Sequence, residues 1–427
     1  MDRRVVITGM DMITPLSIGK RASWEGMCQS KSGIDYITYF SSKSFNTTIA
    51  GEIKQFDFQK LWGAPINLDQ LGRQTQFSII AAKMAIEDSG LDINRLDRSR
   101  IGVYLGAGEG IFDFDGFSQL ILQSWDDTEC NFSKFIPIGK KVLNPIRELE
   151  HDSNQPCAYI ASLFGLHGPN LNCLTACAAS SQAIGQAAAL IRRGNADIMV
   201  TGGAHSMLHP LGLIGFNLLT ALSTENQVPA EASKPFDLRR DGFVIGEGAG
   251  ILILEELEHA KKRGAHIWGE LIGYGTSADA YRTTDSHPEG RGAILAMTRA
   301  LSDAGISADE IDYINAHGTS TVVNDEVETI AIKHVFGERA YAVPVSSIKS
   351  MIGHLIAAAG AVELITCLLA IRDSIVPPTI NYQVPDPTCD LDYVPNTARQ
   401  CSVTTALSNS FGFGGQNVAL IVRRFSE

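Results

Sequence analysis

Residues 168–194 read GPNLNCLTACAASSQAIGQAAALIRRG, in which a short strand pattern runs into a helix of small residues. Its many alanines and its glycine let backbones approach closely, so we expect a buried helix at the centre of the molecule. Residues 343–373, VPVSSIKSMIGHLIAAAGAVELITCLLAIRD, follow the same pattern. The two stretches predict one strand–helix unit that occurs twice.

A second pair of stretches points the same way. Residues 81–108 and 295–318 each read as a helix, a Ser-Gly or Ala-Gly stop, an acidic loop and a buried strand that ends in glycine. One interpretation is that any two α/β segments look vaguely alike; the other is a duplication of βαβ units. Because no linker or charge block divides the chain, we expect two halves, 1–262 and 263–427, packed into one globule.

The composition excludes several classes of protein. The chain has 427 residues, with 35 Lys and Arg against 47 Asp and Glu, and its formal net charge is −12. An apolar content of 44% excludes a disordered protein, and the acidic balance argues against bulk nucleic-acid binding. The apolar runs are too short or too interrupted to span a bilayer. We interpret MDRRVVITGMDMITPLSIG at the N-terminus as a first β-strand, not a signal peptide, of a cytoplasmic protein.

Eight cysteines are too few for a disulfide scaffold, and no CxxC spacing or neighbouring pair of histidines indicates a zinc site. Cys177 lies where a predicted strand turns into a helix. The helix dipole and free N–H groups there lower a thiol pKa and favour the thiolate, and the same N–H groups can hold an oxyanion. The alternative is a buried structural cysteine, an interpretation that fits Cys173 well.

Two histidines are further candidates. His317 follows a predicted strand in NAHGTST, where it can face a cleft beside the hydroxyls of Thr319 and Thr321; the alternative is a loop histidine bonded to backbone. His354 lies at the start of the second small-residue helix, five residues after Lys349. Burial of the His354 imidazole and the Lys349 ammonium group in an apolar helix costs free energy unless the groups are paired or functional.

Asp325 and Glu328, in NDEVET, are the candidate partners of Lys349, and a surface salt bridge is the alternative. The glycine-rich stretch 408–417, SNSFGFGGQN, has no GK[ST] and precedes a strand, so it fits neither a Walker A loop nor a dinucleotide fingerprint. A flexible gate or a backbone oxyanion donor fits it better. Residues 241–250, DGFVIGEGAG, are interpreted as a structural turn into a buried strand.

Five motifs in this order resemble one family: TACAAS, PFDLRRDGFVIGEGAG, NAHGTST, SSIKSMIGHLIAAAGAVE and NSFGFGGQN. They are similar to the β-ketoacyl-acyl carrier protein synthases of the elongating type II branch, and the similarity covers nearly the whole chain. The resemblance implies the α/β thiolase-like fold, a duplicated five-layer α/β/α/β/α sandwich, and a homodimer.

The resemblance also implies roles for individual residues. Cys177 matches the nucleophile that takes an acyl chain from phosphopantetheine, and His317 and His354 match the pair that promotes malonyl decarboxylation and stabilises the enolate. Lys349 matches the lysine that supports the second histidine in a charge network with Glu328. The other matched positions are Asp325 in the charge network, Phe413 as a gate and oxyanion donor, and Thr319, Thr321, Phe411, Phe216 and Glu109 at the substrate.

The implied reaction is a decarboxylative Claisen condensation that extends an acyl chain by two carbons. The substrates would be carried on the phosphopantetheine of an acyl carrier protein, and the enzyme itself would need no cofactor. Alternatives are a specialised polyketide, polyene or unusual-lipid ketosynthase, a non-catalytic partner subunit like a chain-length factor, and a thiolase. The glycine-rich loop lacks the second cysteine of a thiolase, and the Cys-His-His set predicts an active enzyme.

Several positions depart from the family pattern. Glu109 falls where an aliphatic or small acyl-pocket residue is usual, Thr220 replaces an arginine at the pocket mouth, and 134–159 is longer than usual. These departures favour a specialised acyl group, and neutral drift is the alternative. An acidic carrier protein needs a local basic patch on this acidic chain. The candidates are Lys134, Lys140, Lys141, Arg147 and Arg73.

Overall fold

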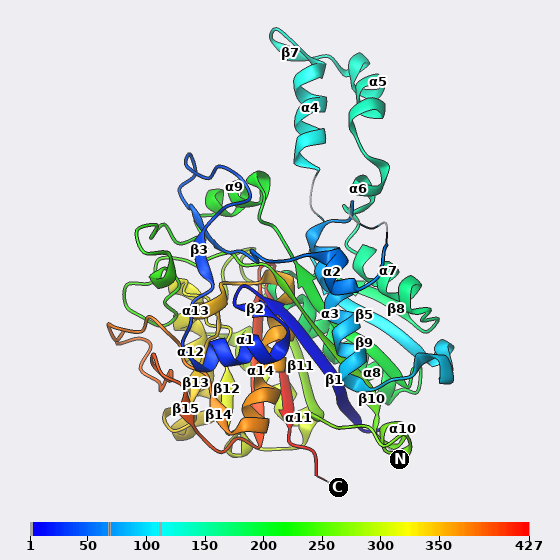
Figure 1. The fold of residues 1–427 in the computed structure, drawn as a ribbon. Coiled ribbons are helices and arrows are strands. Elements are labelled where there is room, and N and C mark those ends of the chain that lie inside the picture. The colour runs from blue at the N-terminus through cyan, green and yellow to red at the C-terminus, as the bar shows by residue number, and fades with distance from the viewer. Residues whose placement is uncertain (1–2, 67, 69, 109, 111–112, 427) are drawn as a thin grey trace.

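The computed structural model describes residues 3–66, 68, 70–108, 110 and 113–426 (Figure 1). Within these residues eleven strands form one sheet, in which two groups of five strands lie side by side and the short β2 (Ser17–Ile18) pairs with β1. The first group is β1 (Val5–Thr14), β5 (Ile101–Ala107), β8 (Asn170–Cys173), β9 (Ile198–His205) and β10 (Gly248–Glu256). The second is β11 (Gly269–Ala278), β12 (Tyr313–Asn315), β13 (Val345–Ser346), β16 (Thr405–Gly412) and β17 (Gln416–Arg423).

The two groups have the same topology. The first has the spatial order β8-β5-β9-β10-β1 and the second β13-β12-β16-β17-β11, so each reads 3-2-4-5-1 in chain order. In each group the first three strands of this spatial order run parallel to one another. The third strand pairs antiparallel with the fourth, and the fourth pairs antiparallel with the fifth. β1 pairs with β11 where the groups meet. We propose that the groups belong to the duplicated halves, 1–262 and 263–427.

Two small-residue helices lie at the centre, as their sequences predicted. α8 (Ala179–Arg192) and α14 (Ala359–Asp373) pack against each other and against strands of both groups. Residues 359–371 are all buried. A Cβ at Gly360 would collide with Oγ of Ser181, so glycine is required for this close approach of the two helices.

Further helices cover the outer faces and complete the five layers. α3 (Arg73–Ser89) packs on β1 and β10, and α7 (Gln155–Phe164) packs on β5. On the other side α11 (Arg291–Ala304) packs on β11 and β17, with α12 (Val322–Phe336) against it. Within the described chain the two groups of strands, which are joined only through β1 and β11, form the two β layers, and α8 and α14 lie between them. The architecture is therefore the duplicated α/β/α/β/α sandwich that the resemblance implied.

A helical hairpin projects from this body (Figure 1). It contains α4 (Phe114–Ser124) and α5 (Phe132–Val142), joined through β6 (Trp125–Asp126) and β7 (Glu129–Cys130), and α6 (Pro145–Leu149) follows it. The segment 134–159, which we expected to be longer than usual, runs from α5 into α7. None of the described helices combines the length and apolar character needed to cross a membrane.

The remaining helices are α1 (Lys20–Cys28), α2 (Phe58–Trp62), α9 (Pro210–Leu218), α10 (Leu257–Lys262) and α13 (Lys349–Ile352). The remaining strands form two small ladders, β3 (Ile34–Tyr36) with β4 (Ile49–Gly51), and β14 (Ile375–Val376) with β15 (Arg399–Gln400).

Candidate active site

Cys177 lies in a tight turn at the start of the first central helix. A 3₁₀ turn, Ala176–Ala178, leads directly into α8, and Ala176 has a left-handed φ of 46°. The second half repeats this turn at Ile356–Ala358 before α14, where Ile356 also has a φ of 46°. A non-glycine residue in this region is strained, and such strain is common at functional sites. The duplicated turn therefore places Cys177 in one half where the other half has Ala357.

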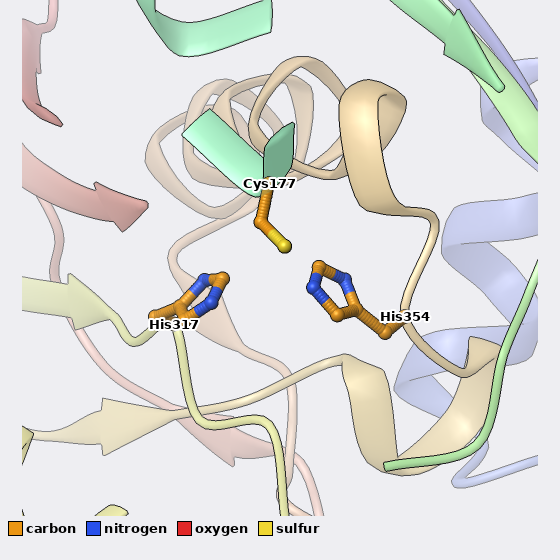
Figure 2. Close-up of side chains that lie close together, drawn as sticks. All are labelled: Cys177, His317 and His354. Carbon is orange, nitrogen blue, oxygen red and sulfur yellow. The ribbon is translucent and has the colours of Figure 1, made fainter. Parts of the chain in front are cut away.

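Two histidines converge on Cys177 (Figure 2). His317 follows β12 and His354 follows α13. The sulfur and one nitrogen from each ring all lie within 4.8 Å of one another, and the two ring centroids are 5.3 Å apart. All three side chains are buried, with at most 6% of each exposed. The fold thus gathers residues from three separate segments into one buried cluster.

His354 is oriented by backbone. Its Nδ1 accepts a hydrogen bond from the N–H of Ile356 at 3.2 Å, whereas Nε2 has no partner among the described residues. Burial lowers the pKa of His354 well below its usual value, with the Lys349 charge acting in the same direction. A neutral ring that accepts at Nδ1 carries its proton on Nε2. His354 therefore presents a free N–H donor.

His317 is held by an ammonium group. Lys349 Nζ donates to the carbonyl of His317 at 2.6 Å and lies 3.4 Å from its Nδ1. Lys349 also forms a buried ion pair with Glu363. Burial lowers the pKa of His317 well below its usual value, so this ring is also neutral. With Lys349 against Nδ1, the Nε2 of His317 is the protonated nitrogen.

Two expectations for Lys349 were wrong. Lys349 bonds His317, whereas the resemblance implied that it supports the second histidine, His354. The expected carboxylate partners of Lys349 were also wrong. Glu363, from α14, pairs with it in place of Asp325 or Glu328. Glu328 instead accepts the backbone N–H groups of His317 and Gly318 at 2.9 and 2.8 Å, which fixes the loop that carries His317. Burial raises the pKa of Glu328 to about 7.

Asp325 also supports the site from a distance. It accepts the backbone N–H of Phe236 at 2.8 Å and lies 3.7 Å from the guanidinium of Arg240. Both carboxylates are fully buried, as expected for groups with a structural or functional partner. Their partners are backbone N–H groups, Arg240 and the side-chain amides of Asn324 and Asn409.

A cavity of about 310 Å³ opens onto the cluster. Cys177, His317 and His354 line it, together with four predicted substrate or gate residues: Thr319, Thr321, Phe411 and Phe413. The hydroxyls of Thr319 and Thr321 lie 2.8 Å apart, and Phe411 packs against the ring of His317. Thr220 lies on the same wall. Phe216 is packed in one apolar cluster with Cys177, and Glu109 lies outside the described residues.

The sequence analysis missed part of this wall. Phe243 packs edge-on against the His354 ring at 5.3 Å and lines the cavity, although its glycine-rich stretch was interpreted as structural. β10 does begin within that stretch, at Gly248, as expected. The loop 283–286 also lines the cavity, and no motif marked it.

Both halves of the chain match known family models. Residues 2–260 match the Beta-ketoacyl synthase, N-terminal domain, and residues 268–383 match the Beta-ketoacyl synthase, C-terminal domain. The chain belongs to the β-ketoacyl synthase family. The 3-oxoacyl-[acyl-carrier-protein] synthase 2 of Coxiella burnetii is 43% identical over 99% of both chains. The enzyme of the same name from Synechocystis is 43% identical over 99% of this chain and 98% of its own.

Solved structures agree. One match is a chain of a complex described as "type II PKS acyl-carrier protein in complex with its ketosynthase bound to the hexaketide". It has a TM-score of 0.88 and 36% identity over the whole of both chains. A beta-ketoacyl synthase from Burkholderia phymatum matches with a TM-score of 0.87 and 32% identity, over 99% of this chain and all of its own.

Burial changes one expectation about the synthase. The sequence predicted a lowered thiol pKa, but burial raises the pKa of Cys177 to about 11. The Lys349 charge and the backbone N–H groups of Phe413 and Cys177 favour the thiolate, but desolvation outweighs them. Both of these backbone N–H groups therefore lie close to the sulfur.

This raised pKa predicts how the free synthase reacts with iodoacetamide. Because only the thiolate reacts, the alkylation rate of Cys177 should rise about tenfold for each pH unit between pH 7 and 9. Mass spectrometry of the Cys177 peptide would measure the rate, with the Cys177→Ala variant as the control. A rate that reaches a plateau below pH 8 would show that the helix terminus outweighs burial.

The cluster of one cysteine and two histidines has the donor set of a catalytic zinc site. A histidine that binds metal usually donates its other N–H to an acceptor. Here Nδ1 of each ring faces a donor instead, Ile356 N–H for His354 and the Lys349 ammonium for His317. The groups around His317 and His354 therefore favour histidines that act as Nε2–H donors over histidines that bind a metal ion.

Most of the predicted basic patch is already paired within the chain. Arg73 bonds the buried Glu247 at 2.7 Å, Lys134 pairs with Asp126, and Arg147 lies 3.2 Å from Asp113. Lys140 and Lys141 lie in the last turn of α5. Paired charges attract an acidic partner less than free ones, so these residues form a weaker docking patch than the sequence suggested.

Proposed function

We propose that the chain is an elongating β-ketoacyl-acyl carrier protein synthase. The observation that carries this proposal is the buried Cys177 thiol facing two neutral imidazoles, each with its proton on Nε2. This arrangement supplies a nucleophile and two donors but no strong base. It suits a reaction in which loss of CO₂ creates the carbanion. The relatives named 3-oxoacyl-[acyl-carrier-protein] synthase 2 support the assignment.

The first half-reaction transfers the acyl group. The Cys177 sulfur attacks the thioester carbonyl of an acyl-phosphopantetheine, and a new carbon–sulfur bond replaces the old one. The N–H groups of Cys177 and Phe413 hold the oxyanion of the tetrahedral intermediate. The thiol proton ends on the departing pantetheine sulfur. Thr319 and Thr321 line the cavity, and we expect their hydroxyls to bond the polar pantetheine arm.

The second half-reaction forms the carbon–carbon bond. A malonyl thioester loses CO₂, and the Nε2–H groups of His317 and His354 stabilise the negative thioester oxygen of the enolate. The enolate carbon attacks the acyl carbonyl on Cys177, whose sulfur leaves and then takes a proton from solvent. The product is a 3-oxoacyl thioester two carbons longer. Because CO₂ loss supplies the electron pair, we expect the enzyme to need no cofactor beyond carrier-bound substrates.

His354 should matter most in the second half-reaction. The His354→Ala variant removes one of two enolate donors, so kcat for condensation should fall by about 10²- to 10³-fold. His354→Asn should recover part of the loss because its amide supplies an N–H. Stopped assays of the 3-oxoacyl product would measure the rates of both variants, with His334→Ala, a change at an exposed position, as the control. Equal rates for wild type and His354→Ala would contradict the assigned role.

We also propose that the chain works as a homodimer. β8 is an edge strand with Leu171 exposed, and exposed edges tend to pair with another strand. In the projecting hairpin, Leu122, Phe132 and Ile136 are each more than two-thirds exposed, an apolar surface that a second copy would cover.

The dimer leads to a direct prediction. The double variant Leu171→Lys with Phe132→Lys should run as a monomer near 46 kDa in light scattering, and wild type at twice that mass. Leu295→Lys, an exposed position on α11 of the main body, is the matched control and should stay dimeric. A monomeric wild type would contradict the proposal.

The function itself is tested by mixing the purified chain with acyl- and malonyl-carrier proteins. The expected result is release of CO₂ and a 3-oxoacyl-carrier protein. Acyl exchange between CoA esters without CO₂ would indicate a thiolase. Activity only with a second, related chain would indicate a partner subunit. A cytoplasmic location is a separate expectation, which cell fractionation tests.

A further inference from the structure

Exposed apolar side chains surround the mouth of the cavity that reaches Cys177. Leu218 ends α9 and is 79% exposed, and Leu219, the next residue, is 48% exposed and lines the cavity. Val322 and Val323 begin α12, line the cavity and are 55% and 45% exposed. Residues that are both exposed and part of the cavity wall mark the place where the cavity meets solvent. We call these four residues the apolar collar.

The collar is not needed for the packing of the chain itself. A side chain that is four-fifths exposed, as Leu218 is, buries little surface against its own core. Polar residues of the cavity wall, among them Thr220, Thr283 and Asn324, lie around the collar. Contiguous exposed apolar side chains with a polar rim are typical of a contact surface for another molecule. The collar therefore points to a partner that covers it.

The charges at this opening give little electrostatic attraction to an acidic partner. Asp241 and Asp285 line the cavity, and its described wall contains no lysine or arginine. Arg282, next to the loop 283–286, lies 3.2 Å from Asp285. The basic residues that the sequence suggested for docking are also mostly paired within the chain. Because paired, exposed charges contribute little, a partner that docks here must gain most of its affinity from apolar contact.

The chemistry of the site identifies that partner. Cys177 is only 6% exposed, so an acyl or malonyl thioester must enter the cavity to reach it. In the proposed reaction both thioesters are attached through a phosphopantetheine arm to a carrier protein. While the arm occupies the cavity, the body of the carrier protein rests on the residues around the mouth. The apolar part of those surroundings is the collar.

We propose that the apolar collar is the docking surface for the acyl carrier protein and that it binds the carrier mainly by burial of apolar side chains. This inference rests on the proposed function and concerns the partner of the same site. Salt screens attraction between exposed charges but does not screen apolar burial, so docking should depend only weakly on ionic strength.

The test compares two donors that carry the same acyl group. One is an acyl-carrier protein, and the other is the acyl thioester of N-acetylcysteamine, which has the end of the arm but no protein. In the double variant Leu218→Ser with Leu219→Ser, kcat/KM for the carrier-bound donor should fall by about tenfold or more relative to that for the carrier-free donor. Leu295→Ser, at an exposed position on α11, is the matched control and should leave this ratio unchanged.

A second measurement uses wild type alone. KM for the acyl-carrier protein should rise by less than about threefold when the ionic strength is raised from about 0.05 to 0.5 M. A rise of about tenfold or more would show docking by charged residues and would overturn the inference.

The remaining outcomes are equally decisive. An unchanged ratio in the double variant overturns the inference and leaves the proposed function intact. If the double variant runs as a monomer while wild type is a dimer, a second copy of the chain covers the collar, and the inference is overturned. If the double variant fails to fold, Val322→Ser with Val323→Ser tests the same collar from α12. If wild type condenses neither donor, the proposed function fails, and the inference fails with it.

Discussion

The Cys177→Ala variant should take up no acyl group and should lose condensation activity by at least about 10⁴-fold, as expected when the nucleophile of a covalent mechanism is removed. The two imidazoles and the oxyanion donors remain, but the described residues that line the cavity include no second thiol to hold the acyl chain. The measurement is the rate of 3-oxoacyl-carrier protein formation, beside transfer of a labelled acyl group to the protein.

Cys173 provides a matched control for this experiment. It lies four residues earlier, and its thiol donates to the carbonyl of Ala179, at the start of the same helix. Cys173→Ala should label and condense close to the wild-type rate. Full activity in Cys177→Ala, or equal losses in both variants, would contradict the assignment of Cys177 as the nucleophile.

The Glu363→Leu variant should be the most destabilising change at the site. It leaves the Lys349 ammonium, which is 1% exposed, without its opposite charge. Removal of one partner from a buried ion pair typically costs about 3 to 5 kcal/mol of the free energy of unfolding. Urea unfolding followed by fluorescence would measure this loss.

The double variant Lys349→Met with Glu363→Leu tests the cause. It removes both charges and leaves apolar side chains of similar size, so it should recover much of the stability lost in Glu363→Leu. Its condensation rate should stay low because His317 loses the ammonium beside Nδ1. Equal unfolding free energies for the single and double variants would show that an unpaired Lys349 charge is not what destabilises the protein.

The fold was largely predictable because small residues leave few alternatives. α8 and α14 carry alanine and glycine where two backbones touch, and a side chain at Gly360 would collide with Ser181. The repeated strand–helix pattern likewise matches two groups of strands with the same 3-2-4-5-1 order. These features are local in the sequence, so a periodicity argument reaches them.

The parts of the site that depend on three-dimensional neighbours were less predictable. Asp325 and Glu328 were reasonable partners for Lys349, but the fold brings Glu363 to it from α14, and the other two carboxylates bond elsewhere. The pKa of Cys177 depends on how deeply the turn is buried, which the sequence pattern does not show. Phe243 reaches the cavity from a stretch whose glycines suggested only a turn.

Intact-mass spectrometry tests the central claim most directly. The chain is incubated with an acyl-carrier protein, its mass is measured, and malonyl-carrier protein is then added. The account predicts a single acyl adduct, mapped to the Cys177 peptide, that disappears on addition of the malonyl donor as a product two carbons longer is formed. An unmodified chain with every donor, or an adduct that malonyl-carrier protein does not discharge, would contradict it.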